Sequence, residues 1–63
     1  MKKINMELTE LEYWITQRKR KKIRLWQIAK EIGCSIPLLS QFENGKINIA
    51  YSSQQIYKQI INQ

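Results

Sequence analysis

The 63-residue sequence contains no histidine, no aspartate and only one cysteine, Cys34, and these absences limit its chemistry. A single cysteine cannot form an internal disulfide, and without histidine a cysteine-based zinc site lacks its usual partner ligand. The sequence also has no nucleophile beside a base and no glycine-rich phosphate loop. We therefore expect a protein that is not an enzyme, binds no cofactor or metal, and is stabilised by side-chain packing.

Long hydrophobic runs are lacking as well. No apolar segment approaches the roughly 18 residues that suggest a membrane span, and the start of the chain lacks the apolar stretch of a signal peptide. A chain of 63 residues is near the lower size at which a hydrophobic core alone can hold a fold. We expect one domain over residues 1–63, inside the cell and without membrane contact.

Positive charge, by contrast, is abundant and unevenly placed. The chain has 11 basic and 5 acidic residues, a net charge of +6, and residues 18–22 form a continuous basic run that Arg24 extends. Concentrated positive potential suits the phosphates of a nucleic acid, but a basic run is also typical of the solvated end of a helix. The run alone does not choose between these interpretations.

Strong helix breakers are few, and they divide the chain into helical segments. They are Gly33, Pro37 and Gly45. The pattern between them predicts helices over about residues 10–21, 25–32 and 36–44, and a last helix that follows Ser52 and Ser53. The predicted fold class is all-α, with four helices.

Local signals mark where two of these helices begin. Thr9 and Glu12 are spaced for a capping box at the start of the first helix, and Leu8 and Tyr13 are spaced for a hydrophobic staple across it. Ser35 can cap the third helix, with a proline in the first turn, where the missing N–H donor costs little.

Apolar residues that recur every three or four positions predict the core. The expected core residues are Leu11, Trp14, Ile15, Ile28, Ala29, Ile32, Leu39, Phe42, Ile56 and Ile60. Cys34 is expected to be a small core residue beside them. In the last helix, Tyr57, Ile60 and Ile61 are explained equally well by core packing and by the interface of a homodimer.

Residues 25–44 have the pattern of a helix-turn-helix. Ala29 is small where the two helices would cross most closely, and Gly33 permits the tight turn. The second helix starts three residues after that glycine.

At this point the sequence resembles a known family, the lambda-repressor-like and Cro-type helix-turn-helix domains of phage and bacterial regulators. Residues 28–35, Ile-Ala-Lys-Glu-Ile-Gly-Cys-Ser, are similar to that family's aliphatic-alanine pair and Gly-x-Ser turn, and residues 43–46 to its Glu-Asn-Gly-Lys. The likeness covers about residues 9–61 and implies a truncated, four-helix domain with a short arm over residues 1–8. It also implies a transcription regulator that binds duplex DNA in the bacterial cytoplasm or in a phage-infected host.

The resemblance assigns roles to individual positions, with residues 36–44 as a recognition helix for the major groove. The positions that match base-reading residues are Ile36, Pro37, Ser40 and Gln41. Phosphate contacts are expected from Asn44 and Lys46, which match family positions, and from the basic residues Lys19, Arg20, Lys21, Lys22 and Arg24. Arg18 and Glu43 match a pair that in some members forms a buried ion pair between the first and third helices.

Departures from the family pattern leave a second function open. Members often carry glutamine where this chain has Leu25 and Ile36. Isoleucine and proline can meet only a thymine methyl group or the shape of the groove, so direct readout would depend mainly on Gln41, which can pair with adenine. The alternative is a protein that binds a repressor or another regulatory protein, as an antirepressor or modulator, through an exposed apolar surface. The candidate residues of this surface are Leu25, Trp26, Ile36 and Leu38. A tryptophan at position 26 is explained equally well by partial burial against its neighbours on the same helix.

Overall fold

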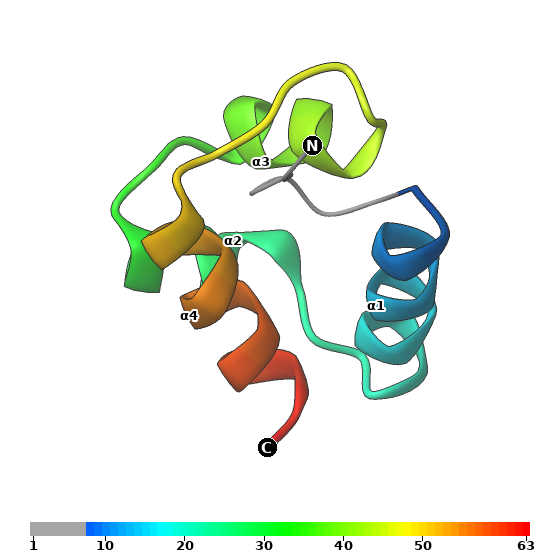
Figure 1. Cartoon of the computed structure of the whole chain (residues 1–63). Coiled ribbons are helices and arrows are strands. Elements are labelled where there is room, and N and C mark those ends of the chain that lie inside the picture. The colour runs from blue at the N-terminus through cyan, green and yellow to red at the C-terminus, as the bar shows by residue number, and fades with distance from the viewer. Residues whose placement is uncertain (1–7) are drawn as a thin grey trace.

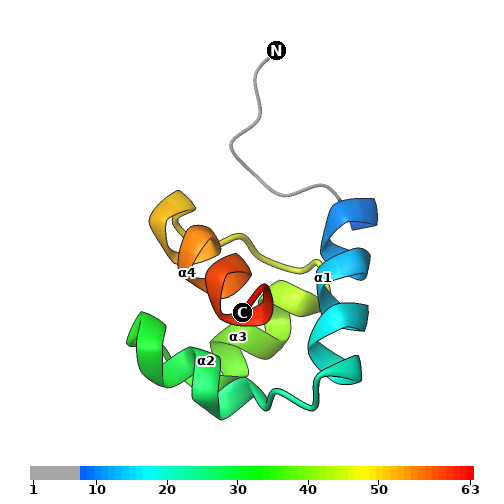
Figure 2. The ribbon, with the colours of Figure 1, turned by 90° about the horizontal axis from the view of Figure 1, so that it is seen from below.

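The computed structural model describes residues 8–63, whose regular structure consists of helices. The helices are α1 (Leu8–Arg20), α2 (Leu25–Ile32), α3 (Ile36–Glu43) and α4 (Tyr51–Ile61). Figure 1 shows α1 and α4 on opposite sides, with α3 across the top, and Figure 2 shows α2 on the α4 side. Both α1 and α2 pack against α3 and α4. The predicted all-α class with four helices is confirmed for the described residues. Of the predicted arm over residues 1–8, residues 1–7 lie outside them.

The start of α1 differs from the prediction. The helix begins at Leu8, so Thr9 lies inside its first turn, and the capping box that needs Thr9 at the N-cap is wrong. The staple is wrong too, because Leu8 and Tyr13 are 63% and 56% exposed and Tyr13 packs edge-to-face on Trp14. Leu8 lies instead against Gly45, where an added Cβ would be 3.0 Å from the leucine Cδ2.

The turn between α2 and α3 forms as the sequence predicts. Gly33 has a φ of 87°, in the left-handed region, and its N–H donates to the Ala29 carbonyl at 2.7 Å to end α2. The Ser35 hydroxyl oxygen accepts from the N–H of Leu38 at 3.2 Å and so caps α3, which has Pro37 in its first turn. These local interactions fix where one helix stops and the next begins.

The last helix, α4, begins at Tyr51, so Ser52 and Ser53 lie inside it and not ahead of it as predicted. The Gln54 side chain, which is buried, donates from Nε2 to the carbonyl of Ile49 at 3.1 Å and ties the first turn to the preceding segment. At the other end, the Lys21 ammonium donates to the Ile61 carbonyl. A cation is favourable there because the last carbonyls of a helix lack backbone partners.

The core draws on all four helices. Its buried apolar residues are Leu11, Ile28, Ala29, Leu39, Phe42, Tyr57 and Ile61. Five predicted core residues are half-buried and pack against this cluster: Trp14, Ile15, Ile32, Cys34 and Ile60.

Ile56 was wrongly placed in the core. It is half-buried and lines an open groove of about 480 Å³ between α2 and α4. The buried face of α4 is instead the stripe of Gln54, Tyr57 and Ile61, which are three and four residues apart. The apolar pattern alone missed this stripe because one of its members is a glutamine.

Candidate nucleic-acid interface

The third helix, α3, buries one side and exposes the other. Leu39 and Phe42 point into the core and are 0% and 1% exposed. Side chains three and four positions apart share a helix face, so Pro37 and Gln41 form an outward ridge that continues to Asn44 just after the helix. All three ridge residues are exposed.

Two apolar side chains flank this ridge. Ile36 is 48% exposed and Leu38 is 38% exposed. Helical spacing places Ile36 with the half-buried Ser40 on one flank and Leu38 on the other. The structure thus brings the predicted base-reading residues together on one outer surface. We call this surface the α3 outer face, formed by Ile36, Pro37, Leu38, Ser40 and Gln41.

The predicted phosphate-binding residues are exposed. They are Lys19, Arg20, Lys21, Lys22, Arg24, Asn44 and Lys46. One of these residues also has a contact within the fold, because the Lys21 ammonium donates to the Ile61 carbonyl at the end of α4. That contact gives Lys21 a structural role, and its part in phosphate binding stays a prediction.

The connection that carries several of these cations is held by backbone hydrogen bonds. The N–H of Lys22 donates to the Lys19 carbonyl at 3.1 Å, with Lys22 in the left-handed region at a φ of 60°. The N–H of Ile23 donates to the Arg18 carbonyl at 3.0 Å. Arg24 then precedes α2, and its N–H donates to the Gln27 side chain at 2.8 Å. The backbone of Arg24 is therefore fixed at the start of α2, while the residue remains exposed to solvent.

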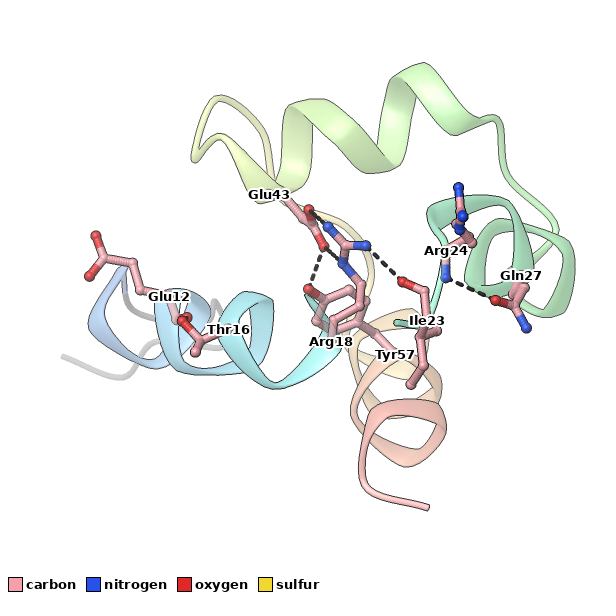
Figure 3. Close-up of polar contacts among 8 residues, drawn as sticks. All are labelled: Glu12, Thr16, Arg18, Ile23, Arg24, Gln27, Glu43 and Tyr57. Atoms are coloured by element: carbon pink, nitrogen blue, oxygen red, sulfur yellow. Dashed lines mark hydrogen bonds and ion pairs between the residues drawn. The ribbon is translucent and has the colours of Figure 1, made fainter. Parts of the chain in front are cut away.

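A nearly buried ion pair joins α1 to α3, at the positions that the family resemblance indicates. Arg18 donates from Nε to Glu43 Oε2 at 2.7 Å and from Nη2 to Oε1 at 3.0 Å (Figure 3). The two side chains are 11% and 9% exposed. Two parallel charge-assisted hydrogen bonds give this pair both strength and a defined orientation.

Tyr57 is a third member of this network, and its polar contact was not predicted from the sequence. Its hydroxyl donates to Glu43 Oε2 at 2.7 Å, and its ring packs edge-to-face on Phe42 with centroids 5.4 Å apart. Burial, followed by the hydrogen bond to Glu43, raises the pKa of Tyr57 well above its ordinary value. A buried tyrosine needs a hydrogen-bond partner for its hydroxyl. Tyr57 in the apolar pattern of the last helix was therefore the one sequence feature that could have indicated a buried polar contact.

Arg18 also connects the two ends of the candidate interface. Its Nη1 donates to the Ile23 carbonyl at 2.8 Å, and Figure 3 shows the guanidinium between that carbonyl and Glu43. Ile23 directly precedes Arg24, and Glu43 directly precedes Asn44. One buried side chain therefore holds the Ile23 carbonyl and the Glu43 carboxylate, and each of these residues is next in sequence to a candidate phosphate contact.

The apolar surface proposed for protein binding is smaller than the sequence suggests. Leu25 is half-buried and packs against the core, so it offers less surface to a partner than the sequence suggests, and its place in an interface stays a prediction. The first turn of α2 needs it there, because Ile28 and Ala29 of the same helix face are buried. Trp26 remains 54% exposed.

Two further findings concern residues 8–63. None of their helices has the length and apolar character needed to cross a membrane. Nor do three or more histidine, cysteine, aspartate or glutamate side chains gather anywhere in this part of the chain to hold a metal ion.

Comparisons with known proteins identify no relative. No family model matches the chain, and no curated protein or solved structure matches it.

Proposed function

We propose that this protein is a lambda-repressor-like or Cro-type helix-turn-helix regulator that binds duplex DNA by placing α3 in the major groove. The observation that carries the proposal is the α3 outer face, which projects from a helix whose opposite side is locked into the core. The major groove of B-DNA is about 12 Å wide and admits one α-helix. A helix held on one side and exposed on the other is suited to that role.

Polar groups at both ends of the interface support the proposal. Arg24 precedes α2, and Asn44 and Lys46 follow α3, so groups that can bind phosphate flank the α3 outer face in the chain. Within the face, Gln41 presents an exposed amide, which can pair bidentately with N6 and N7 of adenine. Phosphate contacts would position the helix, and base contacts would give it sequence preference.

The net charge of +6 supports the same partner. The exposed cations Lys19, Arg20 and Lys22 add positive potential beside the network that holds α3. A cation placed against a phosphate releases a condensed counterion, so binding that uses these groups must weaken as salt increases.

The first test measures this salt dependence. A fluorescent duplex pool with a random central segment is titrated with protein over several salt concentrations. Arg24→Ala and Lys46→Ala should each reduce the slope of log affinity against log salt by about one unit, equally for all sequences. Lys58→Ala is the matched control, because Lys58 lies on α4 and pairs with Glu10, and it should leave the slope unchanged. Equal slopes for all four proteins would count against the proposal.

The second test separates base reading from phosphate binding. With a duplex enriched from the same pool, Gln41→Ala should relax the preference at one base pair by about 1–3 kcal/mol. The salt slope should stay nearly constant, because a base contact releases no counterion. A uniform loss of affinity across all sequences would contradict a base-reading role for Gln41.

A second candidate function is the binding of another regulatory protein, and the exposure of Trp26 favours it. Large exposed apolar side chains often mark a protein interface. In that case Trp26→Glu or Leu38→Glu should abolish a complex with the partner without unfolding the domain, since a carboxylate is costly only where the interface buries it. Salt-dependent DNA affinity no greater than the net charge alone provides would favour this candidate over the first.

A further inference from the structure

The α3 outer face differs from a surface built for hydrogen bonding, because three consecutive residues of it are apolar. Ile36, Pro37 and Leu38 open α3. The core contacts of this helix are made by Leu39 and Phe42, and the exposed Ile36 and Leu38 lie outside the core cluster. Ser35 caps the helix by accepting from the backbone N–H of Leu38, so the cap uses neither the Ile36 nor the Leu38 side chain.

We propose that this face reads the C5-methyl group of thymine, and that A·T-rich duplex DNA is therefore its substrate class. The inference rests on the proposed DNA-binding function. Thymine is the base that presents an apolar group in the major groove, whereas the other base edges there present hydrogen-bond donors and acceptors. Ile36 and Leu38 flank the outward ridge of α3, where they can pack against methyl groups on either side of it.

The same side chains would discriminate against G·C pairs. An aliphatic group placed against guanine O6 or cytosine N4 removes water from that group without replacing its hydrogen bond, which is unfavourable. Gln41 lies on the ridge between the two flanks and can pair with adenine, the partner base of thymine. The apolar side chains would thus recognise the thymine of an A·T pair, and the Gln41 amide would recognise the adenine.

Uracil in place of thymine provides the most direct test. A duplex is enriched from a random pool, and a second copy is made with deoxyuridine for every thymidine, which removes the methyl groups and leaves the base-pairing groups unchanged. We expect the affinity to fall about fourfold for each methyl that the protein covers. Both duplexes are measured at two salt concentrations, so that the phosphate contribution is known separately.

Variants show which side chains are responsible. In Ile36→Ala or Leu38→Ala, the difference in affinity between the thymine and uracil duplexes should shrink toward zero for the methyl that the deleted side chain covers. The matched control is Tyr51→Ala, which removes a 58% exposed side chain from α4 and should keep the full difference. Thermal melts establish that each variant folds.

The outcomes separate the two proposals. Equal affinity for both duplexes, with salt-dependent binding retained, would overturn methyl reading and leave DNA binding in place. A uracil effect that persists unchanged in both α3 variants would also overturn it, since the methyl groups would then act through another residue or through DNA shape. Absence of salt-dependent binding to any duplex would overturn the proposed function, and methyl reading with it.

Discussion

The corner where α1, α3 and α4 meet and the outer face of α3 use their residues in opposite ways. In the corner, Arg18 and Glu43 are charged yet nearly buried, and Tyr57 completes their hydrogen bonds. On the outer face, Ile36 and Leu38 are apolar yet exposed. Buried charge and exposed apolar surface are the two informative departures from the usual distribution, and they indicate different things here. The corner is explained by contacts within the molecule, whereas the outer face is not.

The same helix takes part in both regions. Hydrogen bonds among the residues that the structure describes include Glu43, at the end of α3, but not the side chain of Gln41, two positions earlier. One side of α3 is thus fixed by the fold, and the other is left for a partner. Substitutions in the corner should act on stability, and substitutions on the outer face should act on binding.

The largest effect is expected in the corner. Glu43→Ala leaves the Arg18 charge with little solvent and without its carboxylate, which should cost about 3–5 kcal/mol. That is comparable to the whole stability of a domain of this size, so unfolding is best measured in a stabilising osmolyte. Arg18→Ala should cost a similar amount. A double-mutant cycle should show strong coupling, and strictly additive effects would contradict the pair.

Tyr57→Phe should have the next largest effect, about 1–3 kcal/mol at neutral pH, because the variant removes one hydrogen bond to a buried carboxylate. The raised pKa of Tyr57 adds a dependence on pH. The phenol loses its proton more easily in the unfolded chain, so its contribution is complete below about pH 10 and is lost as the pH rises above that value. Denaturant melts should show a smaller loss of stability above pH 10 in Tyr57→Phe than in the wild type. Parallel curves would contradict this role.

The ion pair between Lys58 and Glu10 is more exposed than the one in the corner, and it should contribute less to the free energy of unfolding. Lys58 and Glu10 lie 2.9 Å apart, with side chains that are 25% and 44% exposed, and the hydrogen bond from Lys58 lowers the pKa of the Glu10 carboxyl. Water screens this pair, so Glu10→Gln should cost no more than about 0.2–1 kcal/mol. Its effect should decrease further in high salt. A cost equal to that of Glu43→Ala would remove the distinction between the two regions.

The smallest effect on stability is expected on the outer face. Gln41→Ala removes an exposed amide, so the free energy of unfolding should change by no more than about 0.5 kcal/mol in either direction. The variant should nevertheless alter base preference. A large loss of stability would indicate that Gln41 belongs to the fold rather than to the interface.

Local signals in the sequence were sufficient for much of the fold. The glycine turn at Gly33 and the cap at Ser35 were predictable because each depends on residues within a few positions. Resemblance to a family supplied Arg18 and Glu43, which are distant in sequence and which no local rule would have paired.

The rest depended on contacts between distant segments. Lys21 reaches the end of α4, and Tyr57 reaches Glu43, through a packing of helices that periodicity does not specify. Leu25 and Ile56 show the same limit, because apolar character alone did not tell which of them packs against the core. The sequence therefore grouped the candidate residues on α3, but of the network that holds this helix it supplied only Arg18 and Glu43, and not Tyr57.

NMR mapping of the surface that meets DNA tests the central claim most directly. Amide signals of isotope-labelled protein are followed while an enriched duplex is added. We expect the largest shifts at Ile36, at residues 38–41, at Arg24 and at residues 44–46, with no change in the groove between α2 and α4. Large shifts along α4 with no change in α3, or no shifts at all, would contradict the account.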